Sequence, residues 1–547
     1  MGFLEERDLC EVPSIPEFYK GKTIFITGGS GFIGKVLIEK LLYSCSELDR
    51  IYLLMRNKKG VKSEDRLAQL YATPCFDRLK KKKPGVFESK VFIVSGDVLE
   101  LGLGLSQEDR ALLVNRVNVI FHVAASVSVG EPCFGTNGSA RPERYHGLTE
   151  NRCETTTALY FVVFDDTLKY AAQMNLRGTM QVMELAKEVR DLSSVVHVST
   201  SYSNTNRDPI EEVLYPPLAD WRDTLAVCDT ADEHTMRVLT PKYLGELPNT
   251  YTFTKQLAEH VVAEYKGQLP VIIVRPSIVI SSVEEPIPGW IENFNGPVGI
   301  FVACGKGIMR TIHTKPDIIC DFIPVDVCAK NIIAGAWIRG TKPLEPTDDI
   351  EIYNCCSGKL NNMLMGDLVE MSKHVSKEIP LDDMLWHTGG TITTNPVYHY
   401  LKVLAQHLLP AILVDTLLWL IGKKPMLVKI QRRIYIANLA LGYYLTQQWT
   451  FDNTNFVQLR SVLKHSDVKQ FYYDLETTDL VEYFTKCCLG GRKFLLKEKD
   501  EDIPKARAHC KRMMILDQTI QIIFHAVVFW WVCMKLVQLF GIESNLF

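Results

Sequence analysis

The chain has 547 residues, and its 61 Lys and Arg residues nearly balance its 64 Asp and Glu residues, which gives a net charge of −3. Apolar residues at 47% and charged residues at 23% are close to globular averages, so disordered, collagen-like and other fibrous classes are excluded. The near-neutral charge gives no electrostatic reason to expect nucleic-acid binding. The length predicts about three folding units.

The N-terminus and the cysteines indicate a protein that folds in the cytosol. The opening residues MGFLEERDLC carry acidic side chains and no apolar core, so they do not resemble a secretory signal. The 15 cysteines include the adjacent pairs Cys355–Cys356 and Cys487–Cys488, whose spacing does not suit a zinc site. We therefore expect reduced thiols and no bound metal.

Short β-branched runs alternate with helical patterns through the first half of the chain. This alternation predicts an α/β fold with a doubly wound parallel sheet of the Rossmann type. Ligands of such sheets bind at the carboxyl ends of the strands. Strands are expected at residues 23–27, 50–55, 90–95, 117–123, 195–199 and 271–274, with helices at 33–43 and 167–185.

Two apolar segments in the second half account for a mean hydropathy of +0.01, which is high for a soluble enzyme. Residues 395–421 are interrupted by Pro410 and Asp415, so a core or interfacial hairpin is expected there rather than a bilayer span. Residues 515–540 contain IIFHAVVFWWVCM after a basic stretch, which predicts a membrane-associated or transmembrane helix with its amino side in the cytosol. Helical patterns at 430–444 and 456–463 predict a small helical domain between these segments.

The first motif, TGGSGFIG at residues 27–34, directly follows a predicted strand and opens a helix. Gly28 permits a tight turn, Gly31 permits close approach of a pyrophosphate, and Gly34 permits close packing of helix on strand. The helix N-terminus offers N–H groups and a positive dipole end to phosphates. The motif therefore predicts a dinucleotide site.

The end of the second strand predicts which dinucleotide binds. An enzyme specific for NAD places a carboxylate there, but this chain has LLMRNKKG with Arg56 and two lysines. Arg56 can hold a 2′-phosphate by a bidentate contact, so NADPH is expected. Asp97 in GDV is expected to accept from the adenine amino group, and HVAA places small side chains where the dinucleotide passes.

Tyr251 and Lys255 lie four residues apart in YTFTK, on one face of a predicted helix. A free tyrosine has a pKa near 10, and a neighbouring ammonium is expected to lower it toward the working range. Thr200, at the end of HVST, is expected to donate a second hydrogen bond to a developing oxyanion. The three residues predict reduction of a carbonyl group.

These motifs occur in the order TGGSGFIG, GDV, HVAAS, HVSTSYSN, YTFTK and RPSIV, which resembles an extended short-chain dehydrogenase/reductase. Longer stretches are similar to the eukaryotic fatty acyl-CoA reductases, among them FYKGKTIFITGGSGFIGKVLIEKLL, LTPKYLGELPNTYTFTKQLAE, PGWIENFNGP and DFIPVDV. The similarity extends over nearly the whole chain, because YHYLKVLAQHLLP and WTFDNTN resemble the C-terminal domain of that family.

The resemblance implies reduction of a long-chain fatty acyl-CoA to a primary fatty alcohol by two NADPH, through a bound aldehyde and with release of CoA. It also implies a substrate loop at 286–297, whereas Lys306 and Arg310 either meet CoA phosphates or belong to a solvated loop. The expected catalytic residues are Thr200, Tyr251 and Lys255. The expected cofactor-binding residues are Thr27, Gly28, Ser30, Gly31, Phe32, Ile33, Gly34, Arg56, Asp97, Val98, Ala124, Ala125, Tyr251, Lys255 and Pro276.

One stretch departs from the family pattern. Residues 130–163 are rich in Gly, Pro, Asn and Thr, lack apolar periodicity, and separate HVAAS from FDDTLKYA, which that family joins by a few residues. A structureless loop of this length inside a compact domain is uncommon. We hypothesise that this atypical insert is a retained intron or an error in the gene structure.

The expected domains are an NADPH-binding reductase domain at 1–345, a connecting region at 346–394, a helical domain at 395–490 and a membrane helix at 515–540. Two alternatives remain: an extended short-chain dehydrogenase acting on another lipid, a sterol or a nucleotide sugar, and an inactive lipid-binding variant if the insert is real. The expected partners are acyl-CoA and membrane lipid, and oligomeric state is open, a homodimer included. The catalytic domain is expected in the cytosol, with the endoplasmic reticulum favoured over the peroxisome.

Overall fold

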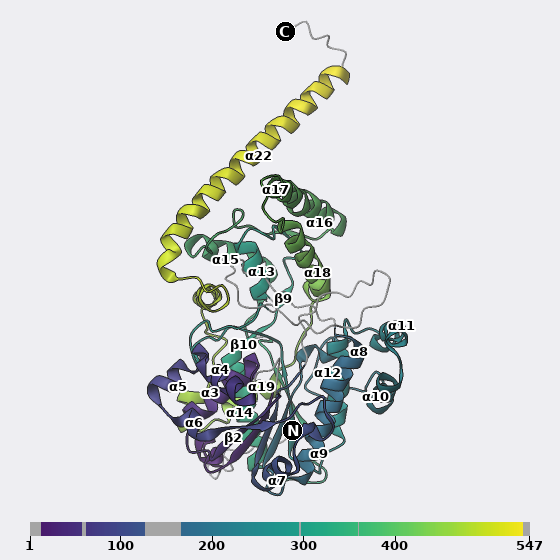
Figure 1. Cartoon of the computed structure of the whole chain (residues 1–547), viewed down its shortest axis with the longest axis vertical. Helices are drawn as coiled ribbons and strands as arrows, with labels where there is room; N and C mark the ends of the chain where they lie inside the picture. The colour runs from purple at the N-terminus through teal and green to yellow at the C-terminus, as the bar shows by residue number, and fades with distance from the viewer. Residues whose placement is uncertain (1–11, 57–61, 126–165, 295–296, 359, 540–547) are drawn as a thin grey trace.

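The computed structural model describes residues 12–56, 62–125, 166–294, 297–358 and 360–539 (Figure 1). Its centre is a parallel sheet of seven strands in the order β11-β6-β5-β4-β1-β2-β3. The strand order reverses between β1 and β4, which is where doubly wound sheets bind ligands. The strands are β1 (Thr23–Thr27), β2 (Arg50–Met55), β3 (Val91–Ser95), β4 (Val119–His122), β5 (Ser194–Val198), β6 (Val271–Pro276) and β11 (Glu351–Cys355). The predicted Rossmann-type fold is confirmed.

Helices cover both faces of this sheet because successive side chains of a strand point to opposite faces. Ile24 and Ile26 of β1 belong to one hydrophobic core, and Phe25 between them belongs to the other. The helices of the first face are α2 (Ile15–Tyr19), α3 (Phe32–Ser44) and α14 (Val325–Thr341), and those of the second are α7 (Gln107–Arg116), α9 (Gly178–Glu188) and α12 (Thr250–Ala263). Smaller helices around them are α4 (Ser63–Ala72), α5 (Asp77–Lys82), α6 (Val86–Lys90), α8 (Leu168–Ala172), α10 (Trp221–Thr230) and α11 (Glu233–Leu244).

The sheet extends past residue 345, where the sequence pattern ended the reductase domain. β11 pairs in parallel with β6 and forms an edge of the sheet. α19 (Thr454–Ser461) packs on it, and the Asn455 side chain donates to the Ile352 carbonyl at 3.0 Å. α20 (His465–Phe471) supplies Asp467, which accepts from the Ile15 N–H at 2.9 Å. Helices from the C-terminal part therefore complete the layer on the sheet.

A second layer lies beyond the carboxyl ends of the strands (Figure 1). It contains three pairs of short strands and most of the C-terminal helices. The strand pairs are β7 (Ile278–Ile280) with β10 (Phe322–Pro324), β8 (Thr311–His313) with β13 (Thr391–Thr393), and β9 (Ile319–Cys320) with β12 (Met363–Leu364). The helices are α13 (Pro297–Gly305), α15 (Met365–Glu378), α16 (Pro396–Val403), α17 (Leu409–Leu420), α18 (Leu427–Thr446), α21 (Leu480–Gly490) and α22 (Ile503–Leu539).

The predicted interruption of the first apolar segment is wrong. α16 and α17 join through a π-helical turn into one helical run from Pro396 to Leu420, long and apolar enough to cross a membrane. Pro410 directly follows the π-helical turn at Leu404–Leu408, where the regular i→i−4 hydrogen-bond pattern is already interrupted. Asp415 faces the start of α18 and accepts from the N–H groups of Met426, Leu427 and Val428, each at 2.9 Å. Neither residue breaks the helix.

The second apolar segment belongs to α22, which the sequence pattern placed at 515–540. The helix begins earlier, and its first turns bind the body of the protein through Arg507 to the Glu378 carbonyl and His509 to the Met384 carbonyl. Farther along, the helix extends away from the body (Figure 1). The apolar window of this helix has no buried residues.

Candidate active site

The glycine turn after β1 leaves no room for side chains at two positions. Gly28 has φ of +77°, and a Cβ on it would lie 2.6 Å from the Ala124 nitrogen. A Cβ on Gly34 would lie 2.4 Å from the Gly28 carbonyl oxygen, so α3 packs directly on the turn. These two glycines perform the tight-turn and close-packing roles that the sequence predicted.

Gly31 differs from these two glycines because its open side faces away from protein atoms. A Cβ there would approach only the Gly28 carbonyl oxygen, at 3.2 Å. Gly31 is the N-cap of α3, and no side chain caps the N–H groups of that helix end. Ser30 and Gly31 are exposed, and Phe32 and Ile33 are half-buried in the first turn. The cradle therefore fits the pyrophosphate of a dinucleotide.

His122 holds the end of β4 against this turn. Its Nδ1 lies 2.7 Å from Thr27 Oγ1, and its Nε2 lies 3.1 Å from Thr179 Oγ1. Burial lowers the pKa of His122 to about 3, so the ring is neutral. The Ala124 N–H reaches Thr27 Oγ1 at 3.4 Å. The sequence motif HVAA contains His122 but does not predict its positioning role. The contact between His122 and Thr27 depends on β1 and β4 being neighbours in the sheet.

Arg56 and Asp97 come together at the ends of β2 and β3. Arg56 Nη1 donates to Asp97 Oδ2 at 2.9 Å, and the Leu99 N–H donates to Asp97 Oδ1 at 3.1 Å. The sequence assigned these two residues to different parts of the cofactor, and the ion pair between them was not anticipated. Val98 is buried against Gly178 of α9, as a structural side chain.

Lys255 lies on α12 and points at the end of β5. Its Nζ donates to the Val198 carbonyl at 2.7 Å, and its side chain is buried. Burial lowers its pKa to about 8. The start of α12 is fixed by Asn249, whose side chain accepts from the Thr252 N–H at 3.0 Å.

Tyr251 shares this face of α12 and forms a hydrogen bond with Thr200. Burial raises the pKa of Tyr251 to about 12, and only the Thr200 bond opposes that rise. The prediction that Lys255 lowers the pKa of Tyr251 is wrong for this structure. The Lys255 ammonium donates to the Val198 carbonyl, and the loss of hydration raises the pKa of the phenol. At neutral pH the phenol is therefore protonated.

Thr200 and Pro276 meet at the ends of the neighbouring strands β5 and β6. Thr200 Oγ1 lies 3.4 Å from the Pro276 carbonyl oxygen, and the Tyr202 N–H lies 3.3 Å from Thr200 Oγ1. The predicted catalytic residues and Pro276 thus form one cluster at the carboxyl edge of the sheet.

A buried ion pair beneath this cluster was missed at the sequence level. Arg275 of β6 donates to both Glu259 carboxylate oxygens, at 2.9 Å and 2.7 Å, and both side chains are fully buried. Glu259 also accepts from Ser199 Oγ at 2.5 Å and Ser203 Oγ at 3.2 Å. The network fixes α12 to the residues on both sides of Thr200. The one local sign of this network in the sequence is Glu259, which lies one helical turn after Lys255.

Two residues expected near CoA phosphates are engaged elsewhere. Lys306 Nζ pairs with Glu498 at 2.6 Å, and Arg310 pairs with Asp517 of α22 at 2.7 Å. The structure therefore favours structural roles for both. In the predicted substrate loop, Glu292 pairs with Lys35 of α3 at 2.6 Å, which places that part of the loop beside the glycine turn.

Comparisons with known proteins agree with this architecture. A family profile described as Male sterility protein matches residues 26–134 and 161–332, and a second profile of the same description matches 406–498. The gap between the first two matches falls within the predicted insert, which lies outside the described residues. Fatty acyl-CoA reductase 1 of Xenopus laevis is 35% identical, covering 91% of this chain and 90% of its own.

Other relatives cover the chain as fully. Human fatty acyl-CoA reductase 1 is 34% identical over 91% of this chain and 90% of its own, and the Drosophila melanogaster fatty acyl-CoA reductase wat is 33% identical over 96% and 93%. Among solved structures, the terminal R domain of the myxalamid pathway has a TM-score of 0.53 at 16% identity, covering 86% and 90%. The reductase domain of a Mycobacterium tuberculosis nonribosomal peptide synthetase has a TM-score of 0.53 at 17% identity, and the match covers 90% of this chain and 97% of that domain. These structures support the fold alone.

The fold, the glycine cradle and the buried Tyr–Lys pair define a nicotinamide-dependent reductase of the short-chain dehydrogenase type. Within that class, the chain belongs to the fatty acyl-CoA reductase family.

Proposed function

We propose that this protein reduces long-chain fatty acyl-CoA to a primary fatty alcohol with NADPH and releases CoA. The observation that carries the proposal is the cluster of Thr200, Tyr251 and Lys255 at the carboxyl edge of the sheet, beside the glycine cradle. The relatives are named as fatty acyl-CoA reductases, which supports the substrate class. The test is formation of hexadecanol from palmitoyl-CoA by the purified protein with NADPH.

The side chains of this cluster divide the work. Bound NADPH supplies hydride, first to the thioester carbonyl and then to the aldehyde. Tyr251 is protonated at neutral pH and donates its proton to the carbonyl oxygen, while Thr200 donates a hydrogen bond to the same oxygen. Lys255 is charged below about pH 8 and would hold the nicotinamide ribose hydroxyls of the bound cofactor. Between the two reductions the Tyr251 phenolate takes the hydroxyl proton of the hemithioacetal back, the C–S bond breaks, and the aldehyde and the CoA thiolate form.

NADPH specificity is assigned to Arg56. Its guanidinium is held by Asp97 at the end of β2, where the ribose of a dinucleotide on the glycine cradle lies. Asp97 and Tyr170 each form a hydrogen bond with this guanidinium, and its five N–H donors leave others for a 2′-phosphate. Arg56→Glu is expected to weaken NADPH at least tenfold more than NADH, because a carboxylate repels the extra phosphate.

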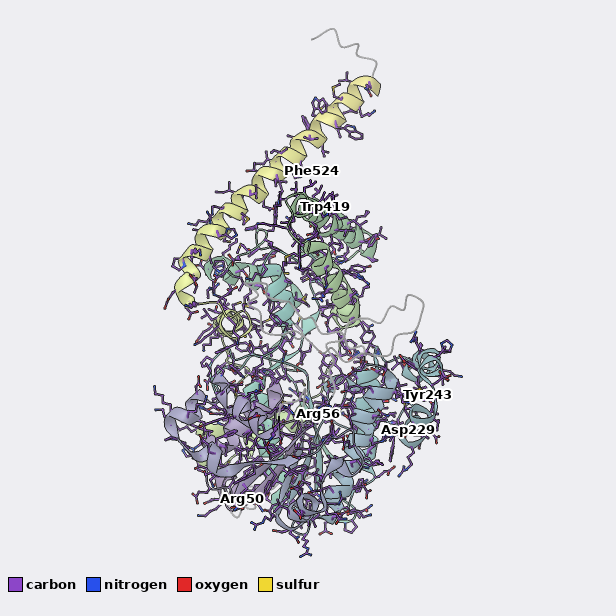
Figure 2. All side chains as sticks on the ribbon, in the orientation of Figure 1. Arg50, Arg56, Asp229, Tyr243, Trp419 and Phe524 are labelled. Carbon is purple, nitrogen blue, oxygen red and sulfur yellow. The ribbon has the colours of Figure 1, made fainter. Side chains whose placement is uncertain are left out.

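The control for this change is Arg50→Glu, at the opposite end of β2 and far from Arg56 (Figure 2). Equal weakening of NADPH and NADH by Arg56→Glu, in fluorescence titrations of both cofactors, would contradict the 2′-phosphate contact.

Membrane attachment is proposed at the end of the molecule that carries α16, α17 and α22. Leu417, Trp419 and Leu420 are each more than 60% exposed on α17, and α22 is long enough to span a bilayer. The basic residues at the start of α22 support a cytosolic position for the sheet domain. The endoplasmic reticulum is the proposed membrane over the peroxisome, and fractionation against markers of both organelles tests it.

A further inference from the structure

An apolar cavity opens next to the catalytic cluster, and nothing above assigns it a ligand. It lies between α13, α15, α18 and the short strands of the second layer, and it is partly open to solvent. Its lining includes Ile278, Phe301, Ile312, Leu368, Val369 and Leu445.

One end of the cavity lies at the catalytic cluster. Tyr202, two residues after Thr200, lines this end and packs edge-on against Tyr444 at 5.4 Å and Trp449 at 5.7 Å. Tyr444 accepts a hydrogen bond from Asn249, the N-cap of the helix that carries Tyr251, at 2.9 Å. A ligand whose reactive group meets Tyr251 therefore has its next atoms at the Tyr202–Tyr444 wall.

The far end lies along α15. Met365, Leu368, Ser372 and Ser376 line the cavity at helical spacing, on one face of this helix. Met365 directly follows β12, and β12 pairs with β9. The residue after β9 is Asp321, which lies near Tyr202, so the Met365 end of α15 is the end nearer the catalytic cluster. From Met365 to Ser376 the helix rises about 16 Å. The hydrocarbon core of a bilayer is ~30 Å thick and is spanned by two acyl chains, so this rise is about the length of one chain.

The charged groups of the lining already have partners. Asp321 accepts from the N–H groups of Ser357 and Gly358, both at 2.9 Å. Lys373 pairs with Glu370 at 2.7 Å. The interior therefore offers hydrocarbon contact with few polar groups left to satisfy, which suits a polymethylene chain better than a polar metabolite.

We propose that this cavity holds the acyl chain of the substrate, with the thioester at Tyr202 and the methyl end toward Ser376. The proposal rests on the reductase function proposed above. Gly390 is the residue that fixes chain length. A Cβ on Gly390 would lie 3.5 Å from Cys304 Sγ and 4.0 Å from Val369 Cγ1, so a larger side chain fits the backbone and fills the cavity between them.

The test compares Gly390→Leu with the wild-type protein on palmitoyl-CoA and octanoyl-CoA. The ratio of kcat/KM for the long chain over the short chain is expected to fall at least tenfold, because a filled pocket excludes the extra methylenes. Gly442→Leu is the matched control, since a Cβ on Gly442 of α18 meets nothing within 4 Å and Gly442 does not line the cavity. A Gly390→Leu protein with the wild-type ratio overturns the assignment.

Binding of radiolabelled palmitoyl-CoA and octanoyl-CoA without NADPH separates this inference from the reaction itself. If the wild-type protein reduces neither ester, the proposed function fails. Selective loss of palmitoyl-CoA binding in Gly390→Leu still supports the cavity assignment, and unchanged binding of both esters overturns it. Cys304→Leu narrows the same stretch from the facing wall and replaces Gly390→Leu if that variant does not fold.

Discussion

The protonation of the Tyr251–Lys255 pair depends on burial more than on the contact between the two residues. Loss of hydration raises the pKa of the phenol to about 12 and lowers that of the ammonium to about 8. A protonated tyrosine is the form that reduction requires, because the reaction consumes a proton at the carbonyl oxygen. The free enzyme is therefore set up as a proton donor.

Replacing Tyr251 by Phe removes this donor and leaves the ring in place. We expect kcat for palmitoyl-CoA to fall by about 10²–10⁴-fold, the usual contribution of a positioned acid. NADPH affinity should change little. Tyr243→Phe is the control, because Tyr243 lies on α11 and packs edge-on against Phe253 rather than joining the catalytic cluster. Steady-state rates that match the wild type in Tyr251→Phe would refute the role of the phenol.

The pKa of Lys255 predicts how cofactor binding depends on pH. Its folded-state pKa lies below the ordinary value of 10.5, at about 8, so the ammonium that holds the ribose is lost as pH rises through 8. We expect the Kd of NADPH to increase from pH 7 to pH 9.5. A flat titration of NADPH over that range would show that the charge of Lys255 does not contribute to binding.

The sequence identified the residues of the cluster but not all of their contacts. Gly28, Thr200 and Tyr251 occur in short motifs whose local spacing determines their chemistry. The Arg56–Asp97 pair and the Glu259–Arg275 pair join residues on different elements, so they depend on how the strands are ordered. No local pattern reveals such contacts.

Secondary-structure elements were predicted best where burial is uniform. β1, β2 and β6 consist almost wholly of buried apolar or β-branched residues, and the sequence located each of them. β11 was missed because its sequence EIYNC is short and partly polar, although four of its five residues are buried against neighbours from distant segments. The helix from Pro396 to Leu420 was misjudged because Asp415 was interpreted as an interruption rather than as a cap.

Asp415→Ala tests this capping role. The variant leaves three N–H groups at the start of α18 without their acceptor, which should lower the stability of the α17–α18 hairpin by about 1–2 kcal/mol. Limited proteolysis between residues 421 and 426 should accelerate accordingly. Asp415→Asn keeps one acceptor oxygen, so its cleavage rate should lie between those of the wild type and Asp415→Ala. Identical cleavage rates in all three proteins would exclude a capping function.

On the scale of the whole molecule, α16, α17 and α22, which carry many exposed apolar side chains, lie toward one end and the sheet lies at the other (Figure 1). The cavity lined by α13, α15 and α18 lies between these two ends. α22 rises about 55 Å, longer than the ~30 Å hydrocarbon layer, and its first turns bind the protein body. The apolar excess in the composition thus has a structural location.

Removing residues 515–547 tests the contribution of α22. We expect the truncated protein to become extractable by alkaline carbonate, because α16 and α17 then attach it only to the membrane surface, whereas the full chain requires detergent. The fraction released is measured by immunoblot of carbonate and detergent extracts. A truncated protein that still requires detergent would assign the main attachment to α16 and α17.

The insert at 130–163 raises the question of whether these residues belong to the working enzyme. The family profile matches both sides of the insert and skips residues 135–160. We propose that the segment is a retained intron or an error in the gene structure. Mature transcripts that carry the segment in most copies would reject this origin.

The stoichiometry of the reaction tests the central claim most directly. Purified protein is mixed with palmitoyl-CoA and NADPH, and NADPH oxidised, CoA released and hexadecanol formed are counted in the same sample. We predict two NADPH oxidised and one CoA released for each hexadecanol. One NADPH per CoA with aldehyde accumulating in solution, or no NADPH oxidation with any acyl-CoA, would contradict the account.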